Sequence, residues 1–182
     1  MYNDTEKSAR RLEEWLKTLE QFNLPDWESL PQLDLYMDQV VLLLTRYLEP
    51  MYTGEDERFV TASTINNYVR MKVMPPPVKK KYSRVHIAYL VIICTLKQSL
   101  CISQIQRMLP VDREEASVRA VYTEFVERFR AVASFVCRTP FSQDRSSLEN
   151  GGLIMTAAIL SVFSKSLTDF LLYEDGGEEY ED

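Results

Sequence analysis

The chain has 182 residues, of which 46% are apolar, so it is long enough to bury one substantial core. It carries 21 Lys and Arg against 27 Asp and Glu, a formal net charge of −6, and only five glycines. With no sustained alternation of apolar and polar residues, this composition argues against a sheet protein, and we expect an all-α, mostly helical fold. Three cysteines, an odd number, and a polar start without an apolar leader favour a reduced, cytoplasmic protein.

A helix and a connector are predicted first. The helix covers residues 3–22 and has one apolar face, and Asn3 and Glu6 have the spacing of a capping box at its start. Residues 24–33 then form a connector with two prolines and a tryptophan. We expect its apolar side chains to pack on the core.

A second helix is predicted over residues 35–48, with Asp34 as its N-cap. Pro50 and Gly54 end it, so residues 49–59 form a linker that includes the last acidic cluster before the middle of the chain.

The most informative feature is the stretch from Phe59 to Val111, here named the acid-free segment because it contains no Asp or Glu. Its eight basic residues are Arg70, Lys72, Lys79, Lys80, Lys81, Arg84, Lys97 and Arg107. The acid-free segment therefore carries a net charge of +8, and the rest of the chain carries −14, which together give the net charge of −6.

A short helix is predicted at the start of the acid-free segment. The hydroxyl of Thr61 or Ser63 can cap it, and Ile65, Tyr68 and Val69 form its apolar stripe. Its other faces are polar, so this helix is a candidate recognition element.

Three consecutive prolines, Pro75 to Pro77, end that helix and force an extended backbone, which predicts a stiff protruding segment with Lys79 to Lys81 at its tip. The next helix, residues 83–99, is apolar nearly all round and therefore belongs in the centre of a domain. We expect His86, the only histidine, to be partly exposed in its first turn.

Two long helices are predicted after Pro110, over residues 112–138 and from Leu153 onwards, separated by a polar turn. The first carries a heptad seam formed by Val118, Tyr122, Phe125, Phe129, Val132 and Val136. The second repeats the spacing with Leu153, Ala157, Leu160, Ser164, Leu167 and Leu171. Two interpretations remain open: an antiparallel hairpin that buries its own seam, and a dimerisation arm.

Several classes of function are disfavoured. The apolar runs 85–96 and 153–163 are about half the length that spans a bilayer, so we predict core helices and no membrane contact. One histidine offers no nucleophile and base pair, which argues against an enzyme. The sequence has no glycine-rich phosphate loop, so we predict no nucleotide cofactor. Cys94 and Cys101 are seven residues apart, which favours buried thiols over a metal site.

The acid-free segment instead predicts an interface with double-stranded DNA. Its cations would neutralise phosphates, and the polar face of the short helix would reach base edges in the major groove. The candidate DNA-binding residues are Ser63, Thr64, Asn66, Asn67, Arg70, Lys79, Lys80, Lys81, Tyr82 and Arg84. The alternatives are a solvated charged surface, a local cap or turn for one of the asparagines, and an anchoring role for Tyr82 against the helix.

The residues of the segment also resemble a known family. Residues 64–76, TINNYVRMKVMPP, are similar to the recognition helix and entry to the wing of MerR-type winged helix-turn-helix regulators. Residues 82–90, YSRVHIAYL, and 102–105, ISQI, continue the resemblance. Together with residues 35–41, LYMDQVV, they are similar to the bacterial family DUF1836, a domain of unknown function.

The resemblance implies a MerR-like winged helix-turn-helix with an N-terminal helix and a C-terminal helical hairpin. The chain departs from the MerR pattern at three positions: Asn66 and Asn67 replace an Arg and a Tyr that grip phosphates, and Lys72 replaces a glycine before the wing. The predicted division is residues 1–30 (helix and connector), 31–111 (winged domain), 112–173 (hairpin) and 174–182 (disordered acidic tail).

We therefore predict a dimeric transcriptional regulator whose partners are double-stranded DNA and a second copy of the chain. The residues identify no effector. The rival hypothesis is a protein-interaction module in which the basic segment docks an acidic partner, for instance the acidic tail of another copy. An RNA-binding function is less favoured because the segment lacks an exposed aromatic platform.

Overall fold

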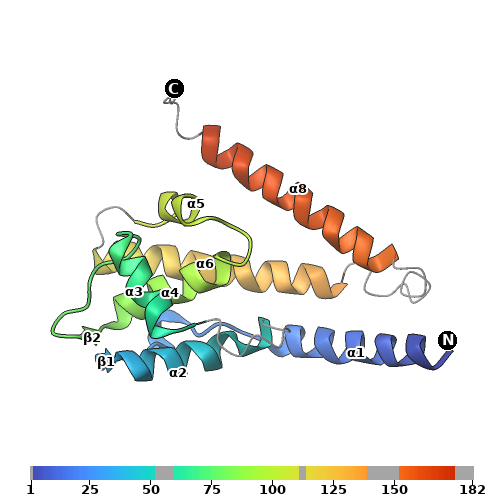
Figure 1. Cartoon of the computed structure of the whole chain (residues 1–182), viewed down its shortest axis with the longest axis horizontal. Coiled ribbons are helices and arrows are strands. Elements are labelled where there is room, and N and C mark those ends of the chain that lie inside the picture. The colour runs from blue at the N-terminus through green and yellow to red at the C-terminus, as the bar shows by residue number, and fades with distance from the viewer. Residues whose placement is uncertain (1, 52–59, 111–113, 139–151, 175–182) are drawn as a thin grey trace. The chain divides into compact units, whose positions relative to one another are not determined.

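The structure is a computed structural model that describes residues 2–51, 60–110, 114–138 and 152–174 (Figure 1). Its elements are α1 (Tyr2–Gln21), the 3-10 turn η1 (Trp27–Ser29), β1 (Leu35–Tyr36), α2 (Met37–Leu48), η2 (Glu49–Met51), α3 (Ala62–Arg70), β2 (Lys81–Tyr82), α4 (Arg84–Leu96), α5 (Ile102–Arg107), α6 (Glu115–Arg138) and α8 (Gly152–Glu174). The fold is mostly helical, as the sequence predicts.

The chain forms two compact units. Unit 1 consists of Met1–Lys17 with Phe135–Asp182, and unit 2 is Thr18–Ser134. Residues 52–59 of the predicted linker, the polar turn after α6 and residues 175–182 of the predicted acidic tail lie outside the described residues, whereas Glu174 is the last residue of α8.

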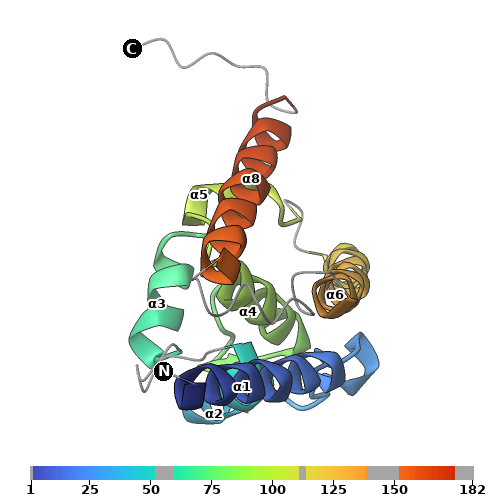
Figure 2. The same ribbon diagram turned by 90° about the vertical axis from the view of Figure 1, so that its right-hand side faces the viewer.

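Helix α4 is the centre of unit 2 (Figure 2). Its residues from His86 to Thr95 are all buried, which confirms the prediction from its apolar sequence. Val40 of α2, Ile65 of α3, Ile105 of α5 and Tyr122 of α6 belong to the same apolar cluster. The acid-free segment therefore supplies both the middle of the core and, through α3 and the chain that follows it, part of the surface.

A small sheet changes the predicted start of the second helix. β1 and β2 pair antiparallel, with Tyr36 opposite Lys81. The prediction that Asp34 caps a helix over residues 35–48 is wrong, because the first two of those residues pair with β2 and the helix begins at Met37. The side chain of Gln39 accepts the Tyr36 N–H at 2.9 Å and starts the helix.

The connector packs on the core, as expected. Leu24, Trp27 and Leu30 are buried. The Tyr122 hydroxyl donates to the Pro25 carbonyl at 2.8 Å, and the Trp27 and Tyr122 rings meet edge to face at 6.0 Å.

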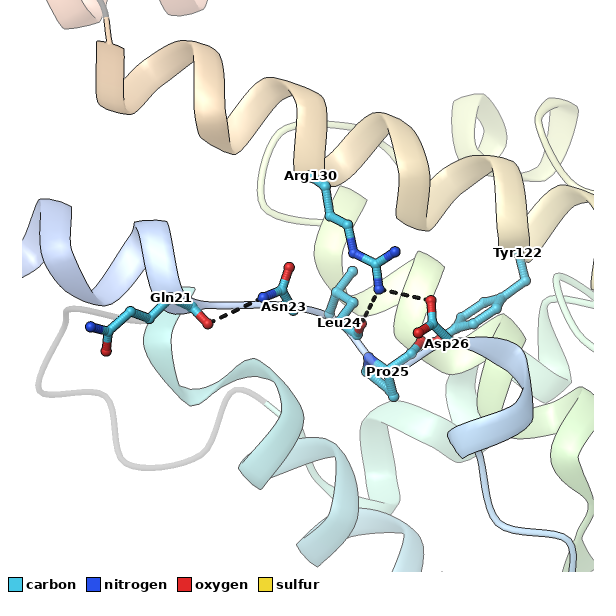
Figure 3. Close-up of polar contacts among 7 residues, drawn as sticks. All are labelled: Gln21, Asn23, Leu24, Pro25, Asp26, Tyr122 and Arg130. Carbon is cyan, nitrogen blue, oxygen red and sulfur yellow. Dashed lines mark hydrogen bonds and ion pairs between the residues drawn. The ribbon is translucent and has the colours of Figure 1, made fainter.

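An ion pair reinforces this contact between the connector and α6. Arg130 donates to the Asp26 carboxylate at 2.7 Å and to the Leu24 carbonyl at 3.5 Å (Figure 3). The connector has no regular backbone pairing here, and its carbonyls at Leu24 and Pro25 accept hydrogen bonds from side chains of α6 instead.

The packed face of α6 follows the predicted seam as far as Phe129, which packs against the core. Val118 and Tyr122 are buried as expected, but Val126 and Ala133 continue the face, and Val132 is 61% exposed. The predicted seam assumes 3.5 residues per turn, whereas a straight α-helix has 3.6, so the buried face drifts away from a strict heptad.

Unit 1 contains α8 and most of α1. α1 is found at residues 2–21, close to the predicted 3–22, while the predicted Asn3 and Glu6 cap involves side chains outside the described part. Along α8 the apolar side chains are exposed, among them Leu160, Leu167 and Leu171.

The length of α8 also changes one expectation from the sequence. The 19 residues from Ile154 to Leu172 are long and apolar enough to cross a membrane by length and composition, which for a single helix is weak evidence. The apolar stretch is therefore longer than the run 153–163 that the sequence singles out.

Candidate nucleic-acid interface

Helix α3 presents a narrow polar face. Ser63, Asn66 and Arg70 are exposed, while Ile65 and Tyr68 on the opposite side are buried. This arrangement follows from the helical period, because positions three and four apart share a face.

Local hydrogen bonds hold the other two polar candidates of α3. Thr61 caps the helix by accepting the Thr64 N–H at 3.1 Å, and the two hydroxyl oxygens are 2.8 Å apart. Asn67 accepts from Arg70 at 2.7 Å through its side-chain oxygen. Of the two asparagines, Asn66 is therefore the more open. Asn67 bonds to side chains on the next turn of α3, which is neither the cap nor the turn considered from the sequence.

The chain leaves α3 through a Schellman motif. The Lys72 N–H donates to the Val69 carbonyl at 3.0 Å and the Val73 N–H to the Tyr68 carbonyl at 3.1 Å. This geometry requires a left-handed residue at the position after the cap, and Lys72 has φ 59° there. Glycine is the usual residue at such a position because a Cβ is disfavoured.

The predicted basic tip is a tight hairpin turn. Val78 and Lys81 exchange two backbone hydrogen bonds of 3.1 and 2.9 Å, so only Lys79 and Lys80 form the loop. Both have positive φ, 50° and 63°, which is the signature of a type I′ turn. Both side chains are exposed.

His86 anchors the segment that leads to this hairpin. Its Nδ1 accepts the Ser83 N–H at 3.0 Å, so Nε2 carries the proton that is donated to the Pro76 carbonyl at 3.1 Å. The prediction of a partly exposed His86 is wrong: it is 5% exposed, with the Pro76 carbonyl and the Tyr82 ring packed against it. This burial lowers the pKa of His86, against the raising effects of the Pro76 hydrogen bond and of Asp34.

Two of the candidate residues lie inward. Tyr82 is buried and meets the His86 ring edge to face at 5.6 Å, which is the anchoring alternative. Arg84 donates to the Leu30 carbonyl at 3.2 Å, and its guanidinium lies 5.7 Å from the Trp27 ring. Both residues fasten the hairpin and α4 to the rest of unit 2.

Tyr36 is an exposed aromatic that the sequence analysis missed. It is 55% exposed and stands opposite Lys81 in the sheet, with the ammonium 5.3 Å from its ring centroid. It lies outside the acid-free segment, between two acidic residues, and only the β1 and β2 pairing brings it to the lysines. An exposed aromatic platform therefore exists beside the basic hairpin.

The structure thus brings Ser63, Asn66 and Arg70 together on α3 and places Lys79 and Lys80 at a hairpin tip. Both belong to unit 2, and Figure 1 shows α3, β1 and β2 at one end of that unit. In the part of the chain that is described, no group of three or more His, Cys, Asp or Glu could hold a metal ion.

These features define a helical domain whose small hairpin carries an exposed basic turn, built from a segment without acidic residues in its sequence. Residues 25–125 match the family model described as Domain of unknown function (DUF1836). The match covers more than half of the chain and includes α3 and the hairpin, so the chain belongs to this family. No curated protein and no solved structure matches the chain.

Proposed function

We propose that this protein is a DNA-binding transcriptional regulator with a MerR-like winged helix-turn-helix over residues 31–111. In this proposal α2 supports α3, α3 enters the major groove, and the Lys79 and Lys80 hairpin is the wing. The observation that carries the proposal is that an exposed polar helix face and an exposed two-lysine tip come from one stretch without a single acidic residue.

The two parts would have different tasks. Lys79 and Lys80 would neutralise phosphates, which supplies affinity that does not depend on sequence. Asn66, the open asparagine of α3, would read a base edge, and asparagine suits adenine because it can donate and accept at once. Arg70 is held by Asn67 beside it and would contact the backbone or a guanine.

The proposal is tested by titrating random duplex DNA at several salt concentrations. The logarithm of the binding constant should fall linearly with the logarithm of salt, because bound cations displace condensed counterions. Replacing Lys79, Lys80 and Lys81 together by Ala should flatten this slope by up to about three units.

The matched control removes the same charge elsewhere. Arg10, Arg11 and Lys17 are exposed on α1, and their replacement by Ala should leave the slope nearly unchanged. Binding that is absent, independent of salt or equally weakened by both triple variants would contradict the proposal.

A second candidate is a non-enzymatic interaction module that docks an acidic protein partner. It is favoured by two exposed apolar side chains beside the lysines: Val78, which is 67% exposed, and Tyr36. An acidic peptide that binds more tightly than duplex DNA, and loses affinity when Val78 is replaced by Ser, would favour this module. A DNA interface predicts that the same substitution has little effect.

We further propose that the regulator acts in the cytoplasm as a homodimer, with α8 contributing the contact between copies. A dimer would present two α3 helices to successive half-sites of a palindromic operator.

A further inference from the structure

The non-glycine residues with positive φ in the described chain are all lysines: Lys72, Lys79 and Lys80. A side chain with a Cβ is less stable than glycine in this region of backbone conformation. Residues kept in such conformations tend to lie at functional sites, where another property of the side chain matters more than stability. The two hairpin lysines belong to the proposed interface, whereas Lys72 has no role there so far.

The backbone at Lys72 has no freedom to avoid the conformation. The two hydrogen bonds of the Schellman motif bracket it, and Val73 and Tyr68, which make one of them, are buried. The Lys72 side chain is nevertheless exposed. It stands two residues beyond Arg70, the last exposed residue of the polar face of α3.

We propose that Lys72 is a further binding residue of the interface, which takes a phosphodiester oxygen of the duplex backbone beside the C-terminal end of α3. This inference rests on the proposed function. Lysine at a glycine position costs stability, and it places an exposed basic side chain two residues beyond Arg70 at the C-terminal end of α3.

Lys72 would act separately from the wing tip. It is seven residues from Lys79, and an extended chain of that length spans at most about 25 Å. The two residues would therefore contact phosphates of the same stretch of DNA backbone, within about 25 Å of each other.

The competing explanation is purely structural. A cation near the end of a helix interacts favourably with its exposed carbonyls, so lysine could stabilise α3 without touching DNA. The two explanations differ because only the binding role couples Lys72 to the salt dependence of DNA affinity.

The test is Lys72→Gly in the full chain. Glycine removes the strain of a left-handed backbone that carries a Cβ, so the melting temperature should rise by about 2–4 °C. This is the shift expected when the free energy of unfolding of a protein of this size increases by about 1 kcal/mol. The salt slope of binding to random duplex DNA should fall by about one unit, because one phosphate contact is lost. Lys72→Arg, which keeps the charge, should retain the slope.

The matched control is Lys97→Gly. Lys97 is an exposed lysine of the same acid-free segment with φ −62°, so glycine there relieves nothing. Its melting temperature should fall and its salt slope should stay unchanged.

A stabilised Lys72→Gly protein with the wild-type slope would overturn the inference and leave the proposed function standing. A lowered melting temperature would also overturn it, because the lysine would then be the better residue for the backbone. Wild-type protein without salt-dependent DNA binding would remove the proposed function itself, and this inference with it.

Discussion

At the scale of single residues, three helices of unit 2 begin with the same hydrogen bond. The third residue is Gln39 in α2, His86 in α4 and Gln104 in α5, and each side chain accepts the backbone N–H before its helix at 2.9 to 3.0 Å. Glutamine is a usual residue for this capping interaction. His86 differs because it can gain a proton, and a protonated ring cannot accept the Ser83 N–H.

Stability should therefore depend on pH through His86. Burial lowers its pKa below 6.5, so in acid the unfolded chain binds a proton that the folded chain resists. The stabilising contribution is complete above pH 6.5 and is lost as the pH falls towards the folded pKa. Each unit of difference between the folded and unfolded pKa corresponds to about 1.4 kcal/mol.

The variant His86→Gln separates this effect from other titrations. Glutamine keeps an acceptor for the Ser83 N–H but does not titrate, so the free energy of unfolding should fall less steeply between pH 7 and 5.5 than in the wild type. Chemical denaturation at each pH gives this comparison, and NMR of the single histidine gives the pKa directly. A folded pKa at or above 6.5 would contradict the prediction.

At the scale of elements, composition and period predict the large helices well. α4 could be placed in the core because almost every one of its positions is apolar. The connector could be placed against the core because its tryptophan and leucines are removed from water only by packing there. β1 could not be predicted, because two residues carry no period and the strand exists only through its pairing with β2. The position of the buried face of α6 depends on neighbours distant in sequence.

The contact of the connector with α6 should be worth a measurable part of the stability. The Tyr122 hydroxyl is buried, which raises its pKa, and donates to the Pro25 carbonyl. Tyr122→Phe leaves that carbonyl without this partner and should lower the free energy of unfolding by about 1–1.5 kcal/mol. Thermal or chemical denaturation measures the loss.

Tyr36→Phe is the matched control for that substitution. The same oxygen is removed from a residue that is 55% exposed, so the change should stay within about 0.5 kcal/mol. Equal losses for the two variants would argue against the hydrogen bond as the source.

At the scale of the whole molecule, the charge pattern located the candidate interface but not its shape. The acid-free segment pointed to α3 and the wing, yet it counted Tyr82 and Arg84 among the contacts because sequence does not say which way a side chain turns. It also gave no sign of the left-handed backbone at Lys72, because a lysine does not indicate positive φ. Tyr36 was omitted because β pairing alone brings it to the lysines.

The apolar side of α8 raises the question of what covers it. Phe163, Leu167 and Phe170 are exposed on a broad face, and Lys165 and Asp169 form an ion pair of 2.8 Å on the other side. Two charged residues lie within the 19-residue apolar stretch, and charges inside a bilayer are costly, so this pair disfavours a membrane span. In the proposed dimer, a second copy of the chain would cover the apolar face and leave the ion pair in water.

Introducing charged residues on the apolar face of α8 should then separate the copies. Phe163→Asp with Phe170→Asp places two carboxylates on the apolar face, whereas Ser161→Asp with Thr168→Asp adds the same charge about 160° away around the helix. Sedimentation equilibrium should give a monomer for the first pair and a dimer for the wild type and the second pair. The first pair should also bind a palindromic duplex more weakly, since each half-site is then bound separately. A monomeric wild type at micromolar concentration, or a wild type that floats with lipid vesicles while the charged variants do not, would refute the dimer.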